Sequence, residues 1–330
     1  MLSRQLGKNG STISALGLGC MGMSDAYGPA DRQESIATIH AALDAGVNLL
    51  DTGDFYGMGH NELLLHEALA GRRREDVFIA VKFGALRSPD GKFIGFDGRP
   101  EAVKTSLAYT LKRLGTDYID LYQPARLDPR VPIEDTVGAI SEMVKAGYVR
   151  QIGLSEVGAD TIRRAHAIHP ITWLQIEYSL LSRGIENDIL PTVRELGIAV
   201  TAYGVLSRGL LSGHWSKERS EQDPRGHLPR FSGENLDRNL LLVEALRLIA
   251  QEHNATVAQV AIAWVLSRGN DIVPLIGARR RDRLNEALGA LDLHLGEDDL
   301  ARIEAAVPLD AVAGDRYAPE QMAMLDSEKR

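Results

Sequence analysis

Three polar side chains stand at or just beyond the ends of short apolar runs, where they could act together on a proton. Asp51 follows the run 47–50, Lys82 follows the run 77–81, and Tyr56 lies five residues beyond Asp51. A free tyrosine has a pKa of about 10, so it is a poor acid–base catalyst near neutral pH. A neighbouring ammonium would lower this pKa, and a carboxylate would keep the ammonium charged and oriented. The trio could therefore pass a proton to a carbonyl oxygen, although a buried Asp–Lys pair beside a core tyrosine fits the same spacing.

The runs that end in these residues belong to a set of eight, and most are followed by a segment with helical spacing. They are rich in Val, Ile and Leu and mostly do not alternate with polar residues, which is typical of strands buried on both faces. They span residues 15–19, 47–50, 77–81, 118–122, 149–154, 171–176, 198–202 and 272–276. Glycines that could cap the intervening helices are Gly46, Gly115, Gly147 and Gly197. This alternation predicts an α/β fold, a (β/α)8 barrel.

The alternative, a doubly wound dinucleotide-binding sheet, depends on one weak motif. Residues 17–22 contain the letters Gly-x-Gly-x-x-Gly, but Gly28 and Pro29 interrupt any helix after them. Because such a motif should open a helix, we prefer the barrel. In a barrel the reactive side chains lie at the C-terminal ends of the strands. The candidates there are Asp51, Lys82, Gln123, Ser155, Glu156, Gln175, Tyr203 and Gly277.

Three segments stand outside the repeat of what we expect to be a single domain, residues 1–330. Residues 2–6 and 12–15 flank Lys8-Asn9-Gly10 and predict a β-hairpin that plugs the barrel bottom. Residues 212–238 are polar and rich in glycine, proline and charge, which predicts a lid-like insertion or a mobile loop at the C-terminal face. The tail, 308–330, has little periodicity, so it is either disordered or draped over the barrel mouth.

Composition limits the functions open to this chain. Its 330 residues are 44% apolar and 25% charged, which is typical of a globular protein. No apolar run approaches the roughly 20 residues of a membrane helix, and residues 1–10 show no signal-peptide core. The single cysteine, Cys20, excludes an internal disulfide and fits a cytoplasmic location. A net charge of −8 argues against a nucleic-acid binder, and no metal-ligand spacing is present, so we expect no metal. The oligomeric state stays open.

A series of ordered motifs resembles the signatures of the aldo-keto reductases, in a bacterial branch related to the potassium-channel β-subunit-like and pyridoxal reductase-like members. The motifs are Asp-Thr-Gly-Asp-Phe-Tyr-Gly at 51–57 with Asn61-Glu62, Ala-Val-Lys-Phe-Gly at 80–84, Tyr-Ile-Asp-Leu-Tyr at 118–122, Gly-Leu-Ser-Glu at 153–156, Gln-Ile-Glu-Tyr-Ser at 175–179, the segment 202–213 and the segment 277–286. Together they cover about residues 12–300 of the chain.

The resemblance implies reduction of a small aldehyde or ketone by NADP(H). Tyr56 would donate the proton, Lys82 would lower the pKa of its phenol, and Asp51 would hold the lysine. Tyr203 would stack on the nicotinamide, and Ser155, Glu156 and Gln175 would hold its carboxamide. The implied cofactor-binding residues are Gly22, Met23, Asp51, Ser155, Glu156, Gln175, Tyr203, Gly204, Leu206, Ser207, Gly209, Leu211, Gly277, Arg279, Arg283 and Glu286. Candidate substrate contacts are Tyr27, Tyr56, Gln123 and Arg126.

The preference for NADP(H) over NAD(H) depends on a cluster of arginines. Arg279, Arg280, Arg281 and Arg283 crowd the start of an expected helix. Cations there oppose the helix dipole, whereas a bound anion would relieve the conflict. The resemblance places the adenosine 2′-phosphate at this point. A solvated basic stretch balanced by acidic neighbours is the alternative interpretation.

One departure from the family pattern bears on activity. Relatives have a histidine after the fourth strand, and alignment on Arg126 and Asp128 places Ala125 there. Alanine cannot donate to a carbonyl oxygen, so Gln123, Arg126 or a water could replace the histidine, or Tyr56 alone could suffice. The alternative function is a cofactor-binding redox sensor or regulatory subunit with little turnover.

Two milder departures concern the cofactor. Glu156 stands where many relatives have asparagine, and a carboxylate can still accept a hydrogen bond from an amide. Ala287 stands where an adenine-contacting asparagine is common, which would loosen the hold on adenine.

Overall fold

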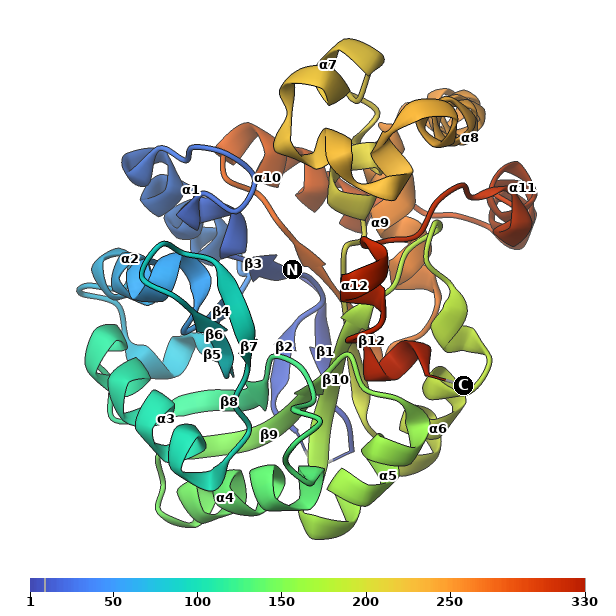
Figure 1. The fold of residues 1–330 in the computed structure, drawn as a ribbon. Helices are drawn as coiled ribbons and strands as arrows, with labels where there is room; N and C mark the ends of the chain where they lie inside the picture. Colours follow the sequence, from blue (N-terminus) through green and yellow to red (C-terminus); the bar gives the residue numbers. More distant parts are fainter. Residues whose placement is uncertain (9, 330) are drawn as a thin grey trace.

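The computed structural model describes residues 1–8 and 10–329 and contains a closed barrel of eight parallel strands (Figure 1). The barrel strands are β3 (Gly17–Gly19), β4 (Leu49–Gly53), β5 (Phe78–Phe83), β8 (Ile119–Pro124), β9 (Val149–Ser155), β10 (Ile171–Glu177), β11 (Ala199–Tyr203) and β12 (Ile272–Ile276). Barrel strands that follow one another along the chain pair side by side, and β12 closes the barrel against β3. The predicted (β/α)8 barrel is confirmed, and each of the eight apolar runs supplies one strand.

Helices surround the barrel and lead the chain from one strand to the next (Figure 1). The longer ones are α1 (Arg32–Asp44), α2 (His60–Ala68), α3 (Pro100–Leu114), α4 (Ile133–Lys145), α5 (Ala159–Ile168), α6 (Ile189–Leu196), α8 (Gly233–Glu252), α9 (Val257–Ser267), α10 (Arg281–Leu288) and α11 (Glu297–Ala306). Gly115 and Gly197 cap α3 and α6 at φ angles of 64° and 69°. These left-handed positions explain why glycine ends both helices.

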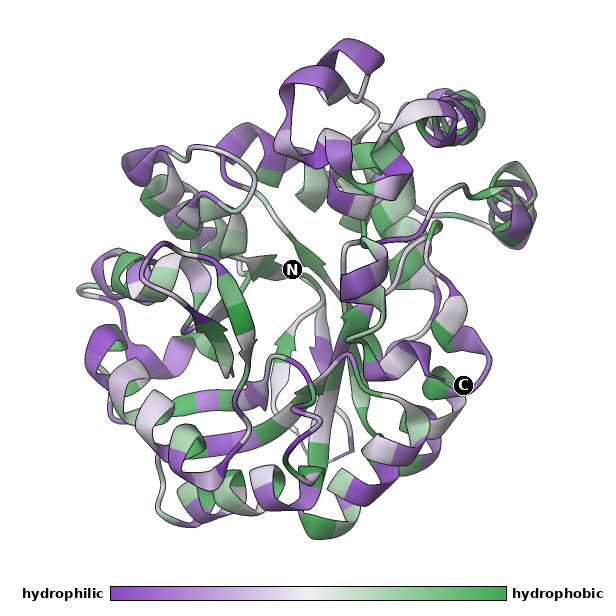
Figure 2. Cartoon of the chain, in the orientation of Figure 1, coloured by the Kyte–Doolittle hydropathy of each residue, from purple (hydrophilic) through white to green (hydrophobic). Residues whose placement is uncertain are grey.

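An antiparallel hairpin closes the bottom of the barrel, as predicted. It consists of β1 (Ser3–Gln5) and β2 (Thr12–Ser14), while Asn9 of the expected turn lies outside the described residues. Leu6 and Ile13, at the inner ends of the hairpin, are completely buried. They pack into one cluster with barrel side chains that include Phe78, Leu121 and Trp173. Figure 2 shows hydrophobic residues on the barrel strands and a mixture of hydrophilic and hydrophobic residues on the surrounding helices.

The Gly-x-Gly-x-x-Gly letters do not open a dinucleotide-binding helix. β3 is followed by a short 3₁₀ turn, η1 (Met21–Ser24), and the chain then runs as a loop to α1. The prediction of a barrel in place of a doubly wound sheet is therefore confirmed.

Three additions cover the C-terminal mouth of the barrel. The hairpin β6 (Ala85–Arg87) and β7 (Phe93–Phe96), which the sequence analysis did not foresee, rises after β5. The insertion 212–238 contains α7 (Lys217–Gln222) and the start of α8, so it is partly helical. The tail carries α12 (Pro319–Met322) and lies beside the mouth in Figure 1. Within the described residues, no helix combines the length and apolar character that crossing a membrane requires.

Candidate active site

The carboxylate of Asp51 is the centre of a buried polar network at the strand ends. Parallel pairing of β4 with β5 brings it beside Lys82, whose Nζ donates to Oδ1 at 2.6 Å and to Oδ2 at 2.7 Å. From β10, Gln175 donates through Nε2 to Asp51 Oδ1 at 2.8 Å. All three side chains are buried. The structure therefore brings three of the predicted site residues together. The two hydrogen bonds to Asp51 hold the ammonium of Lys82 in place.

Tyr56 stands next to this network, in the loop after β4. It begins the 3₁₀ turn η2 (Tyr56–Gly59) and is only 8% exposed. Lys82 Nζ lies 5.4 Å from the centroid of its ring, and Phe55 meets that ring edge to face at 4.8 Å. Among the described residues, no side chain or backbone group is hydrogen-bonded to the Tyr56 hydroxyl. The phenol therefore lies beside the Lys82–Asp51 ion pair, and its hydroxyl is free to bond to a ligand.

The predicted lowering of the Tyr56 pKa by Lys82 is wrong in this structure. Burial, followed by the negative charge of Asp51, raises the pKa of the phenol well above its usual value. Lys82 is neutralised by Asp51, and burial lowers the pKa of its own ammonium. The cation that opposes the rise at Tyr56 is Arg126. Tyr56 consequently keeps its proton at neutral pH, as a proton donor must.

The segment after β8 presents an arginine to the mouth. Arg126 Nη1 donates to Ala125 O at 2.6 Å and to Ser155 Oγ at 3.3 Å, and Nη2 donates to the Tyr317 hydroxyl at 3.4 Å. Gln123 is instead completely buried in the barrel, where its Oε1 accepts from Trp173 Nε1 at 2.7 Å. Gln123 is therefore not available as the substrate contact that the sequence analysis expected, whereas Arg126 is.

Glu156 has a set of partners that differs from the expected one. Its carboxylate accepts from Arg316 at 2.8 Å (Oε1) and 2.6 Å (Oε2), and Oε1 also accepts from the Tyr203 hydroxyl at 2.6 Å. Ser327 Oγ donates to Oε2 at 2.8 Å, and the Glu177 backbone N–H donates to Oε1 at 2.9 Å. With both oxygens occupied by protein groups, Glu156 holds the tail and Tyr203 rather than presenting a free acceptor to a carboxamide.

The backbone at Glu156 supports this interpretation. Its φ is 54°, in the left-handed region where asparagine is tolerated better than glutamate. The strain is maintained by surrounding structure, as such conformations require. The carboxylate is completely buried, and the ion pair with Arg316, itself 7% exposed, is the strongest of its contacts. Glutamate at this position is explained by the arginine that the tail supplies.

The tail is fixed over the mouth, so the draped alternative is the correct one. Asn239 of α8 donates to Ala313 O at 2.8 Å and accepts from Ala313 N at 2.9 Å. Tyr317 donates to or accepts from the Tyr203 hydroxyl at 2.9 Å, and the Arg208 guanidinium covers its ring at 4.1 Å. The tail therefore delivers a second tyrosine to the same space as Tyr203 and Arg126.

A second buried glutamate lies close to three arginines, which come from the segments that cover the mouth of the barrel. Glu177, at the end of β10, lies 3.5 Å from Arg208, 3.5 Å from Arg230 and 3.4 Å from Arg316. These arginines come from the segment after β11, the insertion and the tail, respectively. Arg230 also donates to Leu181 O at 2.7 Å. The mouth is thus assembled around two buried glutamates, Glu156 and Glu177.

The segment after β11 turns sharply through three residues in the left-handed region. Ser207, Arg208 and Gly209 have φ angles of 44°, 54° and 101°, and the N–H groups of Ser207 and Gly209 donate to the carbonyl oxygens of Gly204 at 2.7 Å and Leu206 at 2.8 Å. A Cβ added to Gly277 would meet no atom within 4 Å, so there is room beside this backbone. Of the other predicted cofactor residues here, Gly204 and Leu206 are partly exposed, whereas Leu211 is buried in the core.

The first rim loop meets the end of the barrel at a second predicted cofactor region. A Cβ on Gly22 would lie 3.3 Å from Cγ of Arg279, so the two are in close contact. Met23, in contrast, is 2% exposed and belongs to the hydrophobic core. Tyr27 faces the insertion, where the Arg225 guanidinium lies 5.3 Å from its ring. The rim loop and the insertion therefore approach each other across the cleft.

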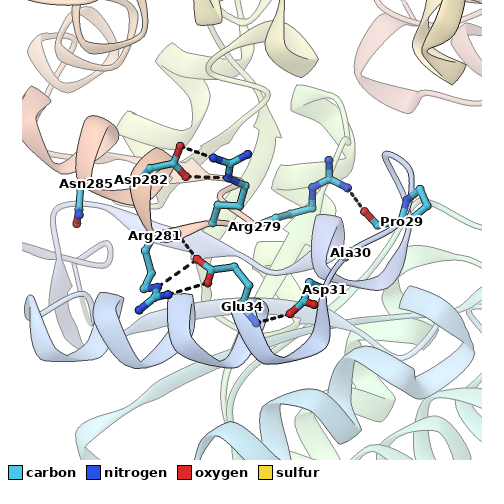
Figure 3. A pocket seen from close by; sticks show the side chains of 9 residues that line it. Pro29, Ala30, Asp31, Glu34, Arg279, Arg281, Asp282 and Asn285 are labelled. Atoms are coloured by element: carbon cyan, nitrogen blue, oxygen red, sulfur yellow. Dashed lines mark hydrogen bonds and ion pairs between the residues drawn. The ribbon is translucent and has the colours of Figure 1, made fainter.

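The arginines before α10 divide into two groups. Arg280 pairs with Asp282 at 2.9 Å and Arg281 pairs with Glu34 of α1 at 2.9 Å, on the wall of an outer groove of about 880 Å³ (Figure 3). Arg279 lines the same groove but donates to the carbonyl oxygens of Gly28 and Pro29, and no carboxylate of the described residues lies within 4 Å of it. Acidic neighbours thus balance only part of the basic stretch.

Arg283 and Arg279 are both close enough to the insertion to act on the charge of Arg219. It donates to Glu286 Oε2 at 2.9 Å and is hydrogen-bonded to His214 at 2.9 Å. Burial, followed by repulsion from Arg225, lowers the pKa of Arg219, and Arg283 and Arg279 add to this repulsion. Arginines of the insertion and of the barrel end therefore crowd together, an arrangement that a polyanion would stabilise.

Sequence reasoning missed Arg316, Tyr317, Arg219 and Arg225. The tail gave no periodic signal, and single arginines in a polar insertion do not differ in sequence from solvated ones. The only available hint was Glu156 in place of asparagine, because a buried carboxylate needs a cation. Among the described residues, no group of three or more His, Cys, Asp or Glu side chains is arranged to hold a metal ion.

Comparison with known proteins agrees with this fold. The model of the Aldo/keto reductase family matches residues 15–308. The probable aldo-keto reductase 1 of Glycine max is 46% identical over 318 residues, which are 95% of this chain and 91% of that protein. The chain therefore belongs to the aldo/keto reductase family, whose members are oxidoreductases that act on carbonyl compounds and generally use nicotinamide cofactors.

Solved structures of oxidoreductases share the architecture. A glycerol dehydrogenase from Gluconobacter oxydans has a TM-score of 0.83 at 27% identity, covering 93% of this chain and 96% of its own. An aldo-keto reductase from Bacillus halodurans, in its holo form, has a TM-score of 0.79 at 29% identity, covering 94% and 97%. A thermostable aldo-keto reductase in complex with the inhibitor epalrestat has a TM-score of 0.75 at 30% identity, covering 93% and 100%.

Proposed function

We propose that this protein reduces aldehydes or ketones with NADPH and that Tyr56 protonates the carbonyl oxygen. The observation that carries the proposal is the Tyr56 hydroxyl, which is protonated and unused beside the network of Lys82, Asp51 and Gln175. A donor without a competing partner can bond directly to a substrate oxygen. The family identity supports the reaction class.

The polar network has a defined task in this mechanism. When Tyr56 gives up its proton, the phenolate would form beside the ammonium of Lys82, whose Nζ lies 5.4 Å from the centroid of the ring. Asp51 keeps that ammonium charged, and Gln175 keeps Asp51 oriented, so Gln175 is a positioning residue. Arg126 adds a second positive charge that opposes the rise in the pKa of the phenol, and it takes over part of the electrostatic task of the family's histidine.

Bound NADPH would supply the hydride that reduces the carbonyl carbon. Tyr203 offers its ring to the nicotinamide, with its hydroxyl fixed by Glu156. Ser155 and the free Oε1 of Gln175 would hold the carboxamide. The open space at Gly277 would receive the diphosphate.

The experiment measures NADPH oxidation with a panel of aldehydes and ketones. We expect turnover for the wild type and a loss of about 10²–10⁴ in kcat for Tyr56→Phe, with unchanged NADPH affinity. Tyr109→Phe, on the exposed face of α3, is the control and should behave as the wild type. Full activity of Tyr56→Phe would refute the proton route. Tight NADPH binding with no turnover of any carbonyl would favour the redox sensor instead.

A further inference from the structure

Arg126 differs from the other arginines of the mouth because no carboxylate partner accompanies it. Among the described residues, its hydrogen bonds go to the Ala125 carbonyl and to the hydroxyls of Ser155 and Tyr317. None of the carboxylates in the described part of the chain lies within 4 Å of its guanidinium. A partly buried charge with only neutral partners is costly, and the usual remedy is an anion.

The acidic groups near Arg126 are already engaged. Glu156 attracts Arg126, but Arg316 occupies both of its carboxylate oxygens. Glu177 is shared by the arginines of the segment after β11, the insertion and the tail. Asp51 is bound on both oxygens by Lys82. The protein therefore leaves a positive charge without a counter-ion at the mouth of a chain whose net charge is −8.

The surroundings of Arg126 are those of a ligand site. Two hydroxyls, from Ser155 of β9 and Tyr317 of the tail, lie at its two terminal nitrogens. Tyr317 in turn is hydrogen-bonded to Tyr203 at 2.9 Å. β8 pairs with β5 with Gln123 opposite Lys82, so Arg126 follows a strand that ends beside the Lys82–Asp51 pair and Tyr56. One arginine fork flanked by hydroxyl groups matches a carboxylate, which is planar and carries a single charge.

We propose that the substrates of this enzyme are aldehydes or ketones that also carry a carboxylate, and that Arg126, assisted by the Tyr317 hydroxyl, binds the carboxylate while Tyr56 meets the carbonyl oxygen. This inference rests on the proposed carbonyl reduction and adds the substrate class. The carboxylate is unchanged by the reaction and serves only to bind and orient. Arg126 thus selects among carbonyl compounds by charge.

The test compares substrates that have the same shape and differ by one negative charge. Formylbenzoate and formylbenzamide are assayed with NADPH as their ortho, meta and para isomers, so that the span between the two groups is varied. We expect kcat/KM for the best formylbenzoate to exceed that of its amide by roughly tenfold or more, since charge-assisted bonds exceed neutral ones. Arg126→Met should abolish this ratio, and Arg126→Lys should keep part of it. Arg163→Met, an equal charge loss on the exposed face of α5, should leave the ratio unchanged.

A binding measurement separates failure of this inference from failure of the proposed function. Benzoate and benzamide are titrated into the protein loaded with NADP⁺, and heat is recorded by calorimetry. Benzoate should bind more tightly in the wild type and lose its advantage in Arg126→Met. Turnover of both aldehydes with equal kcat/KM would overturn the carboxylate preference and leave carbonyl reduction intact. Selective benzoate binding without turnover of any aldehyde would uphold the anion site and reject the catalytic proposal.

Discussion

Tyr56 shows how burial and charge compete at a single residue. The phenol is enclosed by the barrel rim, and the ion pair beside it carries no net charge, so the pKa of Tyr56 rises instead of falling. A protonated phenol suits reduction, in which Tyr56 gives a proton, better than alcohol oxidation, in which it must accept one. For the proposed reduction, the buried phenol therefore starts in the protonation state that the proton donor needs.

Asp54, two residues before Tyr56, gives the protein a stability that depends on pH. Burial and then repulsion from Glu62 raise the pKa of Asp54 to about 7, against roughly 3.9 in an unfolded chain. Between about pH 4 and 7 the folded state holds a proton that the unfolded state has lost, so this group makes stability fall as pH rises through that window. Asp54→Asn removes this contribution.

Urea denaturation at pH 5, 6, 7 and 8 measures the effect of Asp54→Asn. The free energy of unfolding of the variant, relative to the wild type, should increase from pH 5 to pH 8 and change little above it. Asp160→Asn, at the exposed start of α5, serves as the control and should show a constant difference. Parallel pH curves for the wild type and Asp54→Asn would show that the carboxyl is ionised in the folded protein throughout.

At the scale of elements, the tail acts as a structural part of the barrel mouth. Residues 313–328 are held by α8, by the end of β9 and by the segment after β11, through Asn239, Glu156 and Arg208. Since Tyr317 follows Arg316 directly, the ion pair with Glu156 also sets where that tyrosine lies. A segment without periodicity thus gains its order entirely from contacts with the rest of the chain.

Arg316→Met should destabilise the protein by about 3–5 kcal/mol, because it leaves Glu156 buried without its cation. The double variant Glu156→Gln, Arg316→Met should recover much of that loss. Arg302→Met, which breaks the exposed pair with Glu252, should cost less than about 1 kcal/mol. Denaturation of the wild type, Glu156→Gln, Arg316→Met and the double variant completes a double-mutant cycle, and additive losses at Glu156 and Arg316 would mean that the two charges do not depend on each other.

At the scale of the whole molecule, the proposed cofactor cleft is assembled from distant parts of the chain. The first rim loop, the insertion and the start of α10 meet around Gly22, Arg219, Arg225, Arg279 and Arg283. These basic groups are concentrated there although the chain as a whole is acidic. Such a concentration favours the ligand that brings the most phosphate charge.

Arg279→Met should therefore weaken NADPH binding by roughly tenfold or more while NADH binding changes little, since only NADPH carries the 2′-phosphate. Arg280→Met is the matched control, because that arginine is adjacent in sequence but paired with Asp282. Dissociation constants from fluorescence titration decide the matter. Equal weakening of both cofactors would place Arg279 at the diphosphate, and no weakening of either would remove it from the site.

The sequence was sufficient for the barrel and for part of the site. The eight apolar runs predicted every barrel strand, because strands buried on both faces have a composition that loops and surface helices lack. Asp51 and Lys82 could be placed together because neighbouring parallel strands end on the same rim. The pKa of Tyr56 could not be predicted, since it depends on how completely the lysine is neutralised.

The remaining site residues escaped prediction for a different reason. Arg316 and Tyr317 reach the mouth through contacts with residues more than a hundred positions earlier in the chain. No local sequence pattern predicts contacts between residues so far apart in the chain. The sequence alone predicts Glu156 as a cofactor contact because its partner Arg316 lies far along the chain, although the buried charge is a clue to such a partner.

The placement of the two chain ends has a practical consequence for anyone who purifies this protein. Met1 packs against Gly46, beneath the barrel, whereas Ser327 is bonded to Glu156 beside the mouth. An affinity tag attached at Met1 would lie far from the candidate active site. The same tag attached after the tail would disturb the segment that carries Tyr317. Preparations that differ only in the tagged end should therefore differ in their kinetics.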